Sequence, residues 1–70
     1  MTRNVVIDDK SRRMLELLAQ GASNRLVARK MGYREGTMRV YLHNLYRKLG
    51  VSRRNEAVRR ARELGLLGGA

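Results

Sequence analysis

The sequence contains no cysteine and no proline, and it has only 6 acidic residues against 16 Lys and Arg. Without cysteine, neither a disulfide nor a thiolate metal site can stabilise the fold, which suits a reducing compartment. The apolar run near the start covers only residues 5–7, too few for a signal peptide or a membrane span. These absences lead us to expect a soluble, cytoplasmic protein.

The chain has 70 residues and a formal net charge of +10. This length suits one small domain, and below about 70–80 residues a single core supplies only about 3–5 kcal/mol. Because 43% of the residues are hydrophobic, we expect a folded domain rather than a disordered basic tail. The excess positive charge favours a polyanionic partner such as DNA, RNA or an acidic membrane, and a solvated basic face is the alternative.

Hydrophobic spacing predicts an all-α fold of four helices separated by glycines. We expect helices over residues 9–20 after Asp8 as N-cap, 24–31 after Ser23, 35–49, and 56–64 after Asn55. Residues 1–6 and 68–70 should fray around an ordered core of about 7–67, in a single domain over residues 1–70. The predicted core residues are Met14, Leu15, Leu18, Val27, Ala28, Met31, Met38, Tyr41, Leu42, Leu45, Leu49, Ala57, Val58, Ala61 and Leu64.

The segment that joins the second and third predicted helices has the spacing of a helix-turn-helix. Ala28 allows two helices to cross closely, Gly32 can adopt the positive φ of a tight turn, and Met38 can fill the corner between the helices. The same residue types occur by chance in other helical hairpins. The functional interpretation therefore depends on what the third helix exposes.

The face of the third helix opposite its apolar stripe carries Gly36, Val40, His43 and Arg47, with Arg39 on one flank. An exposed valine among polar residues is unfavourable in water but suits contact with a thymine methyl group. Arg39 can donate two hydrogen bonds to guanine O6 and N7, and His43 can donate to a base edge or a phosphate. The alternative is a solvated surface on which the valine has no role.

Three segments resemble the LuxR-type, or GerE-like, helix-turn-helix domain of bacterial transcription regulators. They are LELLAQGASNRLVA at residues 15–28, GTMRVYLHNLYRKLGV at residues 36–51, and NEAVRRARELGLL at residues 55–67. The resemblance extends over residues 7–67, nearly the whole chain, with several motifs in the same order and spacing.

This resemblance implies a compact tetrahelical domain whose third helix enters the major groove of double-stranded DNA. It implies base contacts from Arg39, Val40 and His43, and sugar-phosphate backbone contacts from Asn24, Thr37, Tyr41 and Arg47. Members of the family usually bind as two-fold dimers through the fourth helix, where the candidate interface residues are Arg59, Arg62 and Glu63. Symmetric half-sites about one helical turn apart would follow.

Four positions depart from the family pattern. Ser11 replaces the usual acidic residue of the first helix, and Leu26 stands where a capping-box acid would support the second. Arg34 replaces the Ser or Thr that caps the third helix, at a cost of about 1 kcal/mol unless it is retained to bind a phosphate. Tyr41 replaces the usual His, and its phenol can also donate to a phosphate oxygen.

Catalysis and metal binding are not expected, because His43 is the only histidine and the sequence offers no paired carboxylates, nucleophile–base pair or phosphate-binding loop. We accordingly expect no cofactor and no small-molecule ligand. The tyrosines at positions 33, 41 and 46 could stack on single-stranded bases, but their helical spacing favours core packing. Arginines of the fourth helix are expected on a solvated face, with Glu63 paired to Arg59 within the helix or across a dimer.

The leading hypothesis is a sequence-specific, DNA-binding transcription regulator that acts as a homodimer. Only a few residues precede the matching region, so we expect no receiver, ligand-sensing or ATPase domain. The alternative is therefore a small module that forms heterodimers with larger regulators of the same family. A sigma-factor region 4 domain, also a helix-turn-helix, is the nearest alternative among DNA-binding proteins, and binding to RNA polymerase would distinguish it.

Overall fold

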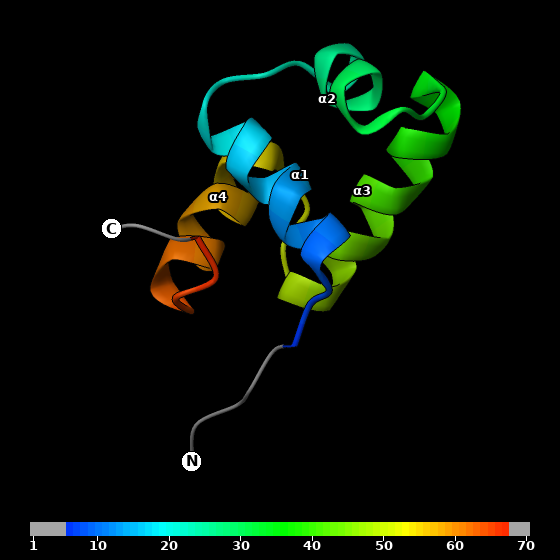
Figure 1. Cartoon of the computed structure of the whole chain (residues 1–70). Coiled ribbons are helices and arrows are strands. Elements are labelled where there is room, and N and C mark those ends of the chain that lie inside the picture. Colours follow the sequence, from blue (N-terminus) through cyan, green and yellow to red (C-terminus); the bar gives the residue numbers. More distant parts are fainter. Residues whose placement is uncertain (1–5, 68–70) are drawn as a thin grey trace.

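The computed structural model describes residues 6–67, which fold into four helices and contain no strand (Figure 1). The helices are α1 (Asp9–Ala19), α2 (Asn24–Met31), α3 (Glu35–Leu49) and α4 (Arg54–Glu63). The all-α prediction is thus confirmed. Fraying is predicted for residues 1–6 and 68–70, of which residues 1–5 and 68–70 lie outside the described residues. No helix in the described range is long and apolar enough to cross a membrane.

The first two helices begin at the N-caps that the sequence predicts. The Asp8 carboxylate accepts a hydrogen bond from the Ser11 backbone N–H at 2.8 Å, and this bond lowers the pKa of Asp8. The Ser23 hydroxyl oxygen accepts from the Leu26 backbone N–H at 3.1 Å. At the other end of α2, Gly32 takes a left-handed conformation with φ 79°, which a side-chain-bearing residue would adopt only with strain.

The predicted start of the fourth helix is wrong. Its N-cap is Arg53 rather than Asn55, which lies exposed in the first turn of α4. The Glu56 carboxylate reaches back and accepts from the backbone N–H groups of Ser52 at 3.3 Å and Arg53 at 3.1 Å. An acid at the third helical position thus satisfies the donors before the helix, and no capping side chain is needed at Asn55.

The core lies between the four helices and contains no buried polar side chain among the described residues. Tyr41 departs from the prediction, because it is 38% exposed at the margin of the apolar stripe, and Met31, Val58 and Leu64 are only half-buried. Leu17 is buried although the sequence analysis left it out. The buried residues are Ile7, Met14, Leu15, Leu17, Leu18, Ala22, Val27, Ala28, Met38, Leu42, Leu45, Leu49, Ala57 and Ala61.

The arrangement of the helices leaves one side of α3 uncovered. Both α1 and α3 pack against α2 and against α4, so the four helices enclose a single core. In Figure 1, α3 lies at one edge of the molecule with its outer side turned away from the other three helices. Val27 and Ala28 of α2 and Met38 of α3 are buried in the corner, as a helix-turn-helix requires.

Candidate nucleic-acid interface

The outer face of α3 presents the three residues that the sequence predicts as base-contacting. Arg39, Val40 and His43 are all exposed, and Val40 has 58% of its surface accessible. Arg39 and His43 are one helical turn apart, and Val40 lies beside them. The fold therefore brings a branched apolar group and two hydrogen-bond donors together on one helix face.

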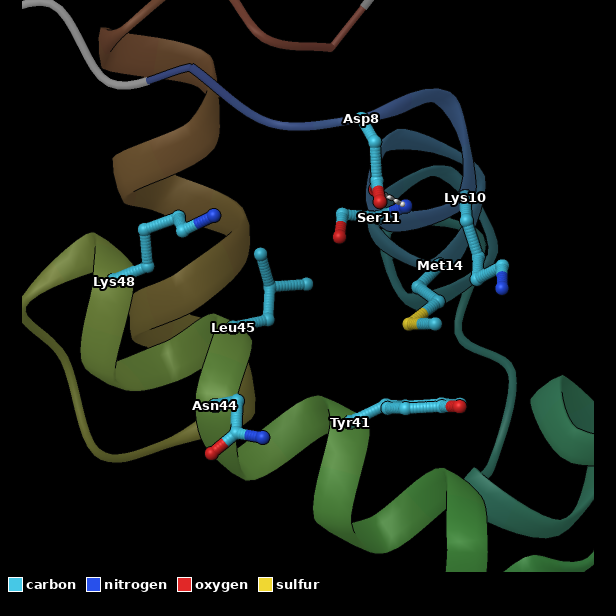
Figure 2. A pocket seen from close by; sticks show the side chains of 8 residues that line it. All are labelled: Asp8, Lys10, Ser11, Met14, Tyr41, Asn44, Leu45 and Lys48. Carbon is cyan, nitrogen blue, oxygen red and sulfur yellow. Dashed lines mark hydrogen bonds between the residues drawn. The ribbon is translucent and has the colours of Figure 1, made fainter.

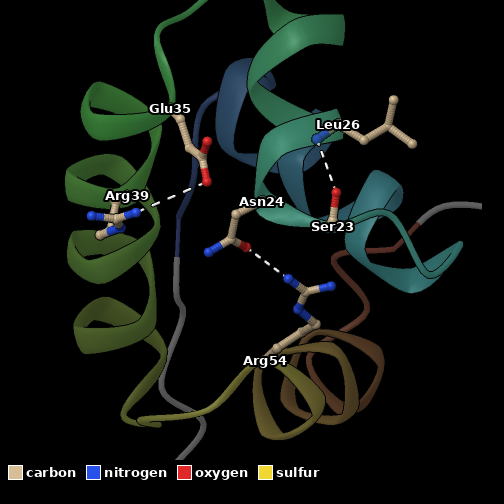
Figure 3. A network of polar contacts seen from close by, with 6 residues as sticks. All are labelled: Ser23, Asn24, Leu26, Glu35, Arg39 and Arg54. Atoms are coloured by element: carbon tan, nitrogen blue, oxygen red, sulfur yellow. Dashed lines mark hydrogen bonds and ion pairs between the residues drawn. The ribbon is translucent and has the colours of Figure 1, made fainter.

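Arg39 is held only loosely by its own helix. Its Nη2 lies 3.9 Å from Oε2 of Glu35, one turn earlier, and the two side chains are 71% and 49% exposed (Figure 3). An ion pair of this kind on a helix surface contributes only about 0.2–0.5 kcal/mol. The guanidinium can therefore leave Glu35 at little cost for an acceptor that takes two parallel hydrogen bonds, such as a guanine edge.

Four of the five residues predicted to contact the DNA backbone belong to α3 or its start. Thr37 and Tyr41 lie one turn apart on one flank, Arg34 precedes the first turn, and Arg47 lies in the last turn in line with His43. Arg34, Thr37 and Arg47 are exposed. Asn24 is set apart from them, because it is the half-buried first residue of α2.

The start of α3 has an acidic residue, Glu35, in its first turn but no side-chain cap. Arg34 occupies the N-cap position and makes no capping hydrogen bond, as the sequence predicts. Gly36 follows in the first turn, and a Cβ added there would meet nothing within 4 Å. Neither residue is required by the packing of the described fold.

Arg54, the first residue of α4, contacts Asn24 in a way that no sequence pattern signals. Its Nη1 donates to the Ala22 carbonyl oxygen at 2.6 Å, and its Nη2 donates to Oδ1 of Asn24 at 2.8 Å (Figure 3). The contacts are part-buried and join residues 30 and 32 positions apart. They tie the start of α4 to the start of α2.

Lys10 is a second residue that the sequence analysis missed. Its Nζ lies 5.1 Å from the ring centroid of Tyr33 and 5.7 Å from that of Tyr41, and the two rings meet edge-on at 5.2 Å. Hydrogen bonding to Tyr33 raises the pKa of the Lys10 ammonium above its ordinary value. Tyr41 thus makes its contacts with Lys10 and Tyr33 at the protein surface rather than in the core.

A groove of about 190 Å³ opens between the start of α1 and the flank of α3 (Figure 2). Lys10 lies on its α1 side and Lys48 on its α3 side, so two ammonium groups border it. The Asp8 carboxylate also lines the groove and offsets part of their charge. Its other lining residues are Ser11, Met14, Tyr41, Asn44 and Leu45.

The outer surface of α4 carries the residues predicted for a dimer interface. Arg59, Arg62 and Glu63 are exposed. The predicted intrahelical pair of Glu63 with Arg59 is wrong, because Oε1 of Glu63 lies 3.4 Å from Nη1 of Arg60, three residues earlier. Arg59 is thus not neutralised by Glu63.

Comparison with known proteins yields a consistent set of relatives. A sequence model of the bacterial regulatory proteins of the luxR family matches residues 9–61. The transcriptional regulatory protein DesR of Bacillus subtilis (strain 168) is 34% identical over 59 residues, covering 84% of this chain and 30% of DesR. The CsgBAC operon transcriptional regulatory protein of Escherichia coli (strain K12) is 33% identical over 57 residues, covering 81% of this chain and 26% of that protein.

A solved structure matches the fold as well. The crystal structure of the response regulator ChrA, from a heme-sensing two-component system, superposes with a TM-score of 0.85 and 34% identity. The match covers 96% of this chain and 33% of ChrA. The chain therefore spans about a third or less of the length of these relatives.

Proposed function

The chain belongs to the LuxR family of bacterial regulatory proteins, and from this membership we propose that it binds double-stranded DNA in a sequence-specific manner, with α3 in the major groove. The observation that carries the proposal is the exposed Val40 between Arg39 and His43 on a face that no other described helix covers. Such a face offers both polar and apolar contacts to base edges. The proposed activity is the regulation of transcription through DNA binding, without a catalytic step. The proposed location is the bacterial cytoplasm.

The three base-contacting residues differ in what they can recognise. Arg39 would donate two parallel hydrogen bonds to O6 and N7 of a guanine, after release from its exposed pair with Glu35. Val40 would pack against the methyl group of a thymine. His43, one turn after Arg39, would donate to a base edge at the next step along the groove.

The backbone contacts would fix the position of α3 in the groove. Thr37 and Tyr41 offer hydroxyl donors on one flank, Arg34 and Arg47 offer charge near the two ends of α3, and Asn24 approaches from α2. The net charge of +10 supports a strong attraction to phosphates. Binding should weaken steeply with salt, with the slope of log K growing by about 0.9 for each phosphate neutralised.

Two copies would bind a two-fold symmetric operator, with α4 of each copy at the interface. Arg59, Arg62 and Glu63 are exposed on this helix and available for contacts between copies. Half-sites would then lie about 10 base pairs apart, one helical turn, so that both α3 helices enter the same side of the duplex.

The test is a selection of random duplexes on the purified chain at about 150 mM salt, near physiological ionic strength, repeated with Arg39→Ala. We expect a two-fold symmetric motif that loses its preference at one base step in the variant, at a cost of about 1–3 kcal/mol. Unchanged affinity and preference in Arg39→Ala would show that Arg39 does not read a base.

A chain that enriches no sequence would contradict the proposal more broadly. If its DNA binding simply follows ionic strength, the chain is a basic helical domain without sequence readout. Capture of a larger regulator of the same family by the same preparation would then support the heterodimer function.

A further inference from the structure

The contact between Arg54 and Asn24 fixes which way the asparagine amide faces. A guanidinium can only donate hydrogen bonds, so the atom of Asn24 that faces Arg54 must be its carbonyl oxygen. The amide nitrogen, Nδ2, is then turned away from Arg54, as Figure 3 shows. Asn24 therefore presents two N–H donors on the side opposite to Arg54.

We propose that Arg54 is a positioning residue for DNA binding, which holds Asn24 so that its Nδ2 donates to a phosphate oxygen of the DNA backbone. The inference rests on the proposed function and assigns a role to a residue outside the predicted interface. Arg54 lies at the start of α4 and acts through Asn24, without contacting the DNA itself.

The bond from Arg54 to the Ala22 carbonyl oxygen fixes the direction in which the guanidinium points. Nη1 donates to the Ala22 carbonyl oxygen at 2.6 Å, so one bond already orients the planar guanidinium when its Nη2 donates to Asn24. An asparagine without this partner can rotate its amide and present either oxygen or nitrogen to the outside. A phosphate oxygen accepts only a donor, so the fixed orientation is the productive one.

A double-mutant cycle tests the inference on the whole chain. Binding to a duplex of about 20 base pairs, two helical turns, is measured for the wild type, Arg54→Gln, Asn24→Ala and the double variant. We expect each single variant to bind about tenfold more weakly, the loss for one hydrogen bond to a charged group. Because Arg54 acts through Asn24, the double variant should be no weaker than the weaker single variant.

Two single effects that multiply in the double variant would overturn the inference, since Arg54 would then act independently of Asn24. The matched control is Arg53→Gln, which removes the same charge from an exposed side chain at the neighbouring position. Its effect should multiply with that of Asn24→Ala. Equal losses in Arg53→Gln and Arg54→Gln would likewise overturn the inference, because charge alone would explain both.

The salt dependence of binding gives a readout that loss of stability does not move. If Arg54 acts only through the neutral amide of Asn24, Arg54→Gln should leave the slope of log K against log salt concentration unchanged. A slope that falls by about 0.9 would mean that Arg54 itself neutralises a phosphate and would overturn the positioning role. Thermal unfolding followed by circular dichroism identifies the temperature at which each variant is folded, and binding is compared there.

Asn24→Asp keeps the inference testable if Arg54→Gln fails to fold. The aspartate retains an oxygen acceptor for Arg54 and loses both outward N–H donors. We expect this variant to unfold at a temperature no lower than the wild type and to bind the duplex more weakly. Wild-type affinity in Asn24→Asp would overturn the inference, whereas a wild-type chain that does not bind the duplex would instead contradict the proposed function.

Discussion

The starts of α2 and α3 differ although the two helices form one helix-turn-helix. At α2, the Ser23 hydroxyl caps the Leu26 N–H and Arg54 donates to the Asn24 side chain, so two side chains of the protein hold the start of this helix. At α3, Arg34 provides no cap, and Gly36 occupies the first turn with open space around it. Side-chain hydrogen bonds thus stabilise the start of α2, whereas the start of α3 has none.

The difference between the two helix starts distinguishes residues that stabilise the fold from residues that do not. Ser23 has an intramolecular partner, and its substitution should be felt mainly as lost stability. Arg34 makes no capping bond and Gly36 has open space around it, so substitutions there should remove no contact that the described fold depends on. Substitutions at these positions should distinguish stability from DNA binding.

The largest loss of stability is expected for a side chain that packs between α2 and α3. Met38 is fully buried in the corner between α2 and α3, and Met38→Ala should lower the free energy of unfolding by about 2–5 kcal/mol. A core of this size supplies only about 3–5 kcal/mol, so the variant should be largely unfolded by circular dichroism. Val40→Ala, two residues later but exposed, should keep wild-type stability. Equal losses in both variants would contradict the assignment of Met38 to the core.

Removal of the α2 cap should come next in size. Ser23→Ala removes the acceptor for the Leu26 N–H and should lower the free energy of unfolding by about 1 kcal/mol, measured by urea denaturation. Ser23→Asp is the control, because a carboxylate can also cap the helix and should retain most of the stability. A Ser23→Ala variant as stable as the wild type would mean that the start of α2 does not depend on its cap.

Introduction of a cap at the start of α3 should raise the free energy of unfolding rather than lower it. Arg34→Ser supplies a capping hydroxyl and should raise the free energy of unfolding by about 1 kcal/mol. The same change removes a proposed phosphate contact, so DNA affinity should fall and the salt slope should decrease by about 0.9. Arg34→Gln removes the charge without an efficient cap, and it should reproduce the loss of affinity but not the gain in stability. A variant that gains both stability and affinity would exclude Arg34 from the interface.

Gly36→Ala should produce the smallest change in stability. Because the added methyl group meets nothing within 4 Å, the substitution should raise the free energy of unfolding by about 0.4–1 kcal/mol. On the proposed DNA face the same methyl group should weaken binding, which fluorescence anisotropy with a labelled duplex would detect. Asn55→Ala, at the exposed second residue of α4, is the matched control and should leave DNA affinity unchanged. Unchanged affinity in Gly36→Ala would show that the DNA does not approach this position closely.

The sequence predicted local features of the fold well, because helix periodicity and caps depend on neighbouring residues. The second and third helices have the predicted bounds, and Asp8, Ser23 and Gly32 act as predicted at helix ends. The start of α4 was mispredicted because asparagine is usually a better cap than arginine. Here the Glu56 carboxylate satisfies the exposed N–H groups instead.

For the candidate site, the sequence predicted which residues are exposed, because the position of a residue around its helix determines its exposure. It did not predict contacts between distant segments. Arg39, Val40 and His43 are exposed because they lie opposite the apolar stripe, and their contacts with bases stay predictions. Contacts between distant segments leave no periodic signal, so neither the Arg54–Asn24 bond nor the Lys10–Tyr33 pair could be predicted. Tyr41, which spacing alone assigns to the core, is 38% exposed and packs edge-on against Tyr33.

The edge-on pair of Tyr33 and Tyr41 also gives the protein an intrinsic spectroscopic probe. The sequence has no tryptophan, so its ultraviolet emission comes from three tyrosines. Two of these rings lie 5.2 Å apart beside the α3 flank, close enough to exchange excitation energy, and Tyr41 is 38% exposed. A ligand that covers this flank would alter their quenching, so occupancy can be followed by light emission from the unlabelled chain.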